Sequence, residues 1–158
     1  MEELITKLNN GLQYVAQIIL LIMVFLVTFD VLGRWLFNQP ITGAVEVTEL
    51  GLSMVIFLSI AYTHLKEEHV SIDFVVAKFP EKVQWVVEGI INLLITALML
   101  LMSLSLFWYA QRFFTSGTVT GDLGLPIYIF AGVAGIGASI FALTGLLLAI
   151  KYFRRVAK

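Results

Sequence analysis

Long runs of residues without Asp, Glu, Lys or Arg constrain this chain more than any other feature of its sequence. Two of them, Leu8–Phe29 and the stretch between Glu88 and Arg112, contain 22 and 23 residues. A helix rises about 1.5 Å per residue, so each run can cross a hydrocarbon core of about 30 Å. The chain is also 59% hydrophobic and 13% charged, which leaves too little polar surface to cover a soluble globule. We therefore predict an all-α integral membrane protein.

Helix breakers between the apolar runs divide the chain into four predicted transmembrane helices. Pro40 ends the first span, because the residue before a proline is biased away from helix. Pro126 lies near the start of the last span, where proline is tolerated. We expect a single membrane domain, residues 1–158, with spans at about 10–36, 44–65, 83–112 and 125–150.

The polar connection between the second and third spans carries an apolar stripe. This stripe predicts a short interfacial helix at about 70–80 and consists of Ile72, Phe74, Val75 and Phe79. At the N-terminus, the first apolar run is too long for a signal-peptide core and no small-residue cleavage site follows it. We therefore expect the first span to be retained.

The positions of the ten Lys and Arg residues predict the orientation. Four spans put both termini on one side, and only Arg34 and Arg112 fall on the other side. By the positive-inside rule, both termini and the middle connection are expected in the cytoplasm. The eight basic residues on that side are Lys7, Lys66, Lys78, Lys82, Lys151, Arg154, Arg155 and Lys158. Nothing in the charge pattern suggests nucleic-acid binding, and the absence of cysteine excludes disulfides and thiolate metal sites.

Ionisable residues gather around the turn between the first two spans. Asp30 and Arg34 are four apart, so they share a helix face and can form a structural ion pair. Alternatively, Arg34 reaches Glu46 or Glu49 across the turn and joins the two helices. Both interpretations make these residues architectural. Glu46 and Glu49 could in principle hold a cation or a proton, but coupling groups normally lie deeper in a span.

Three further ionisable residues lie near the cytoplasmic side. Glu88 can pair with a neighbouring lysine or extend to the interface, or it can serve as a coupling group. His64 and His69 lie at or after the cytoplasmic end of one helix, so they do not form the facing pair that haem needs. The segment between them lacks a tetrahedral ligand set for zinc. We expect no cofactor in this chain.

Small residues in the fourth span recur at four-residue spacing. Such stripes let another membrane helix approach closely, either within this chain or from another subunit. The two stripes are Ala131, Gly135 and Ser139, and Ala134, Ala138 and Ala142.

An ordered set of motifs runs from the first turn to the connection after the second span. The string G-R-W-x-F-N-x-P-I-x-G-A-x-E covers Gly33–Glu46, and H-V-x-I-D covers His69–Asp73. Between them lie E-L at Glu49 and A-Y at Ala61. This set resembles the small membrane subunit of tripartite ATP-independent periplasmic (TRAP) transporters. The sequence Lys66-Glu67-Glu68 before the second motif departs from the family's basic and glycine residues.

The resemblance implies a non-enzymatic small permease subunit in a bacterial or archaeal cytoplasmic membrane. A separate, larger multispanning subunit would bind sodium ions and an organic acid, such as a dicarboxylate or a sialic acid. The small subunit would brace the larger one, contact lipid and help a periplasmic binding protein to dock transiently. The residues implied in structural ion pairs and the subunit interface are Asp30, Arg34, Asn38, Glu46, Glu49, His69 and Asp73.

Two other functions fit the same four-span topology. A self-contained small carrier would act as a homodimer around a membrane glutamate, a role that would fall to Glu88. Known carriers of that kind place the glutamate in their first helix, unlike this chain. An anchoring subunit of an unrelated complex, such as a respiratory enzyme, would differ only in its partner. The motifs from Arg34 to Asp73 are the feature that discriminates among these functions.

Overall fold

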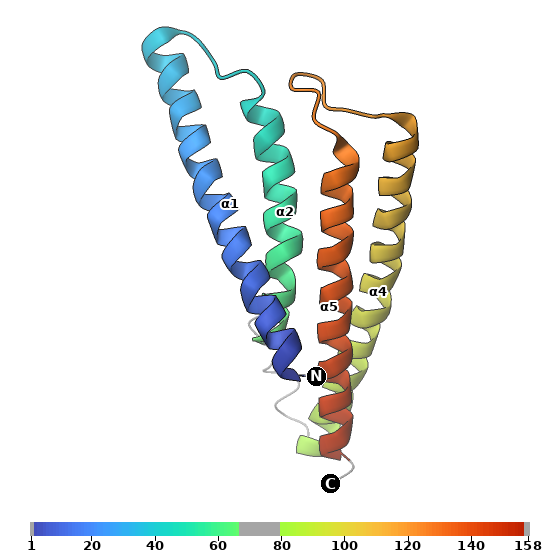
Figure 1. Ribbon diagram of the computed structural model, residues 1–158. Coiled ribbons are helices and arrows are strands. Elements are labelled where there is room, and N and C mark those ends of the chain that lie inside the picture. The colour runs from blue at the N-terminus through green and yellow to red at the C-terminus, as the bar shows by residue number, and fades with distance from the viewer. Residues whose placement is uncertain (1, 67–79, 157–158) are drawn as a thin grey trace.

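The computed structural model describes residues 2–66 and 80–156, which form four long helices (Figure 1). All four are long and apolar enough to cross a membrane, and the described residues contain no strand. The predicted all-α class with four membrane-spanning helices is therefore confirmed. The helices are α1 (Glu2–Phe37), α2 (Ala44–Leu65), α4 (Glu81–Ser116) and α5 (Ile127–Val156).

Three of the helices are longer than a hydrocarbon core of about 30 Å requires: α5 has 30 residues, or about 45 Å, and α1 and α4 are longer still. α1 and α4 have 36 residues each, which gives a length of about 54 Å against a hydrocarbon core of about 30 Å. Helical structure thus begins at Glu2, ahead of the expected first span, and continues to Ser116, past the expected third span. The expected interfacial helix at 70–80 lies outside the described residues, except for Pro80 at the N-cap of α4.

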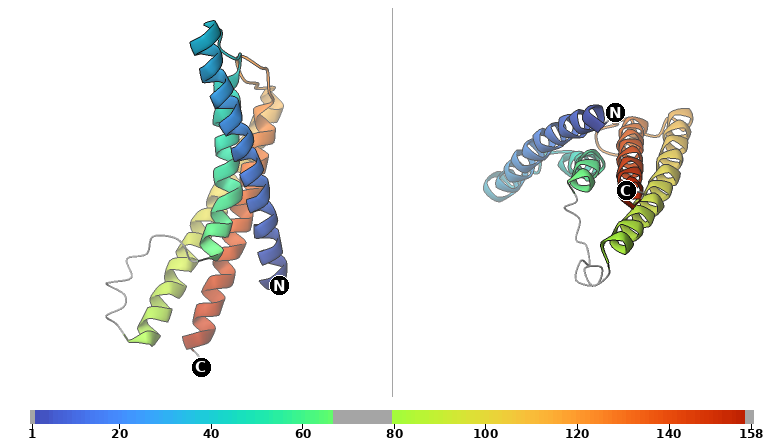
Figure 2. Two further views of the ribbon diagram at one scale, coloured as in Figure 1. Left: turned by 90° about the vertical axis from the view of Figure 1, so that its left-hand side faces the viewer. Right: turned by 90° about the horizontal axis from the view of Figure 1, so that it is seen from below.

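The helices lie side by side in the order α1, α2, α5, α4 rather than in a closed four-helix bundle (Figures 1 and 2). α1 packs on α2, α2 on α5, and α5 most extensively on α4. In the most apolar 18-residue stretch of α5, 56% of the residues are buried. In the corresponding stretches of the other three helices, the share is between 17% and 22%. The core of the fold therefore follows α5, and the outward surfaces of α1 and α4 remain uncovered.

Left-handed residues end the two longest helices at the same end of the molecule. Asn38 ends α1 with φ 55°, and its N–H donates to the Arg34 carbonyl at 3.1 Å. Gly117 ends α4 with φ 63°, and the N–H groups of Gly117 and Thr118 donate to carbonyls in the last turn. Both short loops lie at this end, which we call the loop end, and both chain termini lie at the opposite end (Figure 1).

Candidate functional site

The turn between α1 and α2 is anchored by the carboxylate of Asp30. Its Oδ2 lies 2.7 Å from Arg34 Nη2, and its Oδ1 accepts the Ile41 N–H at 2.7 Å. Asp30 is only 7% exposed, so this carboxylate needs both partners to offset its desolvation. One side chain therefore connects the last turn of α1 to the chain that enters α2.

The sequence left open an ion pair between Glu46 and Arg34, but Glu46 makes a different contact. Its Oε1 accepts the Asp122 N–H at 2.6 Å, and its Oε2 accepts the Leu123 N–H at 3.0 Å. Both donors belong to the loop between α4 and α5, far along the chain. Arg34 pairs with Asp30 instead, and Glu49, one turn further along α2, is exposed. The carboxylate of Glu46 thus joins the start of α2 to the other loop.

A close contact at Gly43 strengthens this junction. Gly43 has φ 77°, and a Cβ built there would lie 2.3 Å from Leu123 Cγ. The absence of a side chain therefore lets the Leu123 side chain lie against the backbone at the start of α2. Within the loop, Thr120 N–H donates to the Leu125 carbonyl at 2.9 Å, and Leu125 N–H donates to Thr120 Oγ1 at 3.0 Å. The two loops consequently form one connected surface.

The small-residue stripes of α5 pack against helices of this same chain. Gly135 lies against the ring of Phe107 on α4, where a Cβ would come within 3.2 Å of it. Ser139 and Ser103 share a hydrogen bond of 2.7 Å, and both hydroxyls lie close to the Gly135 carbonyl. Four residues of the stripes are buried and two are partly buried, namely Ala134, Gly135, Ala138 and Ala142, and Ala131 and Ser139. At these positions the stripes serve packing within the chain.

A close approach between two helices involves Gly137, which was not singled out from the sequence. A Cβ at this position would lie 2.3 Å from the Phe57 carbonyl oxygen of α2. Backbone atoms of α2 and α5 therefore meet here directly. The sequence does show a second glycine two residues after Gly135. Its spacing alone, however, could not predict that this glycine contacts α2.

A group of buried polar residues lies toward the end of the molecule that carries the termini. Asn9 and Thr144 are both 0% exposed, and Asn9 Nδ2 donates to Thr144 Oγ1 at 3.0 Å, which links α1 to α5. On α4, Asn92 and Thr96 are also buried, and Thr96 Oγ1 donates to the Asn92 carbonyl. None of these four residues was singled out from the sequence. The i, i+4 spacing of Asn92 and Thr96 within an uncharged run was the signal that could have found this pair.

His64 belongs to the same buried region. It was expected near the cytoplasmic side, at the end of the second span, and it is only 7% exposed. Its ring lies edge-on to Phe141 of α5, with 4.9 Å between the ring centroids. α5 packs over this position through Phe141, and such a contact between distant helices could not be foreseen from one helix alone. His69 and Asp73, also singled out from the sequence, lie outside the described residues.

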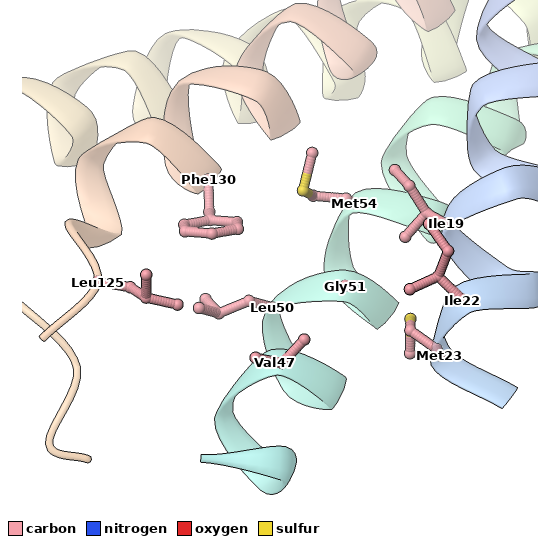
Figure 3. Close-up of a pocket in the computed structure, with 9 residues that line it drawn as sticks. All are labelled: Ile19, Ile22, Met23, Val47, Leu50, Gly51, Met54, Leu125 and Phe130. Carbon is pink, nitrogen blue, oxygen red and sulfur yellow. The ribbon is translucent and has the colours of Figure 1, made fainter. Parts of the chain in front are cut away.

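An apolar cavity of about 220 Å³ lies between α1, α2 and the start of α5 (Figure 3). Only apolar side chains and one glycine line it: Ile19, Ile22, Met23, Val47, Leu50, Gly51, Met54, Leu125 and Phe130. Such a lining offers no hydrogen bond or charge to an acidic solute or an ion. Within residues 2–66 and 80–156, no three His, Cys, Asp or Glu residues gather as a metal site would require.

Comparison with known families identifies the chain's relatives. Residues 23–155 match the family model described as tripartite ATP-independent periplasmic transporters, DctQ component. No individually curated protein matches the chain. The matched segment runs from the middle of α1 almost to the end of α5 and includes both loops, so it covers most of the fold. This family is a transporter component and not an enzyme family. The chain therefore belongs to the DctQ component family and is a multi-pass membrane component of a tripartite ATP-independent periplasmic transporter.

Proposed function

We propose that this chain is the small permease subunit of a sodium-coupled, binding-protein-dependent transporter for an organic acid such as a dicarboxylate or a sialic acid. The observation that carries the proposal is the family match over residues 23–155. A component of a tripartite system works with other subunits, so it need not hold the substrate path itself. In this proposal, the sodium ions and the acid bind to a larger membrane subunit, and the small subunit braces that partner.

The open layer of helices supports a bracing role. Membrane helices associate through close packing and polar contacts, because lipid offers no hydrophobic driving force between them. This chain uses its small residues for internal packing on α5 and leaves broad aliphatic surfaces on α1 and α4 for lipid and a partner. On α4 the exposed residues include Leu94, Leu98, Leu101, Leu104 and Trp108.

The loop end is proposed to face the periplasm, and the end with both termini the cytoplasm. The supporting observation is the charge distribution: the described basic residues of the expected cytoplasmic side lie near the ends of α1, α2, α4 and α5 that are opposite the loops. The membrane is then the cytoplasmic membrane of a bacterium or archaeon. We further propose that Asp30, Arg34, Asn38, Glu46 and Glu49 shape the subunit and docking interface at the loop end. For His69 and Asp73, which follow the second span on the expected cytoplasmic side, we propose a role in the subunit interface only.

Co-purification tests this assignment. The chain, tagged at its C-terminal tail, is solubilised gently from its native membrane, and the proteins that accompany it are identified by mass spectrometry. We expect a large multispanning protein in near-stoichiometric amount and a soluble acid-binding protein as a weaker partner. A bare homodimer would contradict the bracing role and favour a self-contained carrier.

A further inference from the structure

Glu46 occupies an unusual position among the carboxylates of the loop end. It starts α2, yet both of its oxygens accept N–H groups from the loop between α4 and α5, at Asp122 and Leu123. The carboxylate of Asp30 meanwhile accepts the N–H of Ile41 in the other loop. Two carboxylates, each bonded to backbone N–H groups, thus fasten the two loops at the start of α2.

The loop between α4 and α5 depends on this fastening. Gly117 and Gly124 both have positive φ, and glycine loses more conformational freedom on ordering than any other residue. Asp122 and Leu123 are exposed, so their N–H groups would otherwise bond to water. The charge-assisted bonds to Glu46 and the Leu123 contact at Gly43 hold the loop against α2.

Both loops present apolar side chains to the outside once they are joined. Ile41 in the first loop is 40% exposed, and Val119 and Leu123 in the second loop are 52% and 43% exposed. The carboxylate of Asp122 lies beside Leu123 and is exposed as well. Apolar groups bordered by polar ones are the usual composition of a protein-docking surface that forms and separates repeatedly.

We infer that Glu46 is a positioning residue for docking: it holds the two loops together as one preformed surface on which the periplasmic binding protein lands. This inference rests on the proposed function, in which the loop end faces the periplasm. A preformed surface spares the complex the cost of ordering a glycine-containing loop at each encounter. Glu46 acts through the loop whose N–H groups it accepts.

The test uses the complete transporter in proteoliposomes, with uptake measured against the concentration of purified binding protein. Glu46→Ala removes both acceptors, and Glu46→Gln leaves one. Glu81→Gln is the matched control, since Glu81 is also a carboxylate in the first turn of a helix and is exposed, but it lies at the end of the molecule that carries the termini. We expect Glu46→Ala to raise the half-saturating concentration of binding protein about tenfold, Glu46→Gln to raise it less, and the control to stay within about twofold. Maximal uptake and recovery of the large subunit should stay at the parent level.

A second measurement separates positioning from a general loss of structure. Hydrogen exchange at the Asp122 and Leu123 amides should accelerate in Glu46→Ala but not in Glu81→Gln. Faster exchange with an unchanged half-saturating concentration would overturn the inference and leave the proposed function intact. Loss of the large subunit from both Glu46 variants would also overturn it, because Glu46 would then act on assembly. If binding protein fails to stimulate uptake by the parent complex, the proposed function fails and the inference with it.

Discussion

Gly137→Ala should destabilise this protein although the substitution adds a single methyl group to a helix. The new Cβ would lie 2.3 Å from the Phe57 carbonyl oxygen and 2.8 Å from its carbon. Carbon–oxygen contacts in proteins settle at about 3.3–3.6 Å, so α2 and α5 must separate by about 1 Å at this point. The obstacle is backbone and cannot rotate away as a side chain would.

The magnitude follows from two opposing effects. Overpacking of this kind costs about 1–3 kcal/mol, and we expect the upper end here because the clash is with backbone. Alanine in place of glycine in a helix offsets about 1 kcal/mol of this cost. The expected net loss in the free energy of unfolding is therefore about 2 kcal/mol.

The matched control is Gly132→Ala, in the same helix. A Cβ at Gly132 meets nothing within 4 Å, so only the propensity gain of up to about 1 kcal/mol should appear. Unfolding by SDS titration in mixed micelles, followed by circular dichroism, measures both variants against the parent chain. Their difference should approach 3 kcal/mol, the sum of the two expectations. Equal stabilities of the two variants would refute the close contact between α2 and α5.

Three further changes test other parts of the molecule. Thr144→Val leaves the buried Nδ2 of Asn9 without its acceptor and should cost about 1–2 kcal/mol in the same titration; Thr28→Val, an exposed threonine with the same bond to its own helix, is the control. If both valine variants lose the same stability, the link between α1 and α5 has no energetic role. Arg34→Ala removes the ion pair that anchors the first turn and should lower the yield of purified complex with the large subunit; an unchanged yield contradicts this. Glu88→Gln should leave the sodium dependence of uptake intact, and an altered dependence would argue for a coupling role.

Residue spacing predicts one contact at the loop end but not the other. Asp30 and Arg34 are four residues apart, and a helix alone brings them onto one face. Glu46 pairs with amides 76 and 77 residues further along the chain. No local pattern predicts that distance, because it depends on how α2 and the loop before α5 come together. Only the position of α5 beside α2 makes the contact possible.

The burial of polar residues likewise depends on the packing of helices and cannot be read from local spacing. Asn9 lies at the start of the first apolar run, where a polar side chain is expected to reach water. It is instead fully buried, because α1 crosses α5 near Thr144. His64 is covered for a related reason, since Phe141 of α5 packs over it. In each case the neighbouring helix decides between solvent and core.

The sequence alone determined that this chain folds in a lipid bilayer, that it is helical and that it has four spans. Each of these follows from local chemistry: an apolar run in a bilayer must satisfy its backbone hydrogen bonds within itself, and a helix does so. The tertiary structure alone decided which helices are neighbours, which glycines permit close approach and which polar side chains are buried. Those features depend on packing between segments far apart in the chain, and in a membrane hydrophobicity favours no particular neighbour.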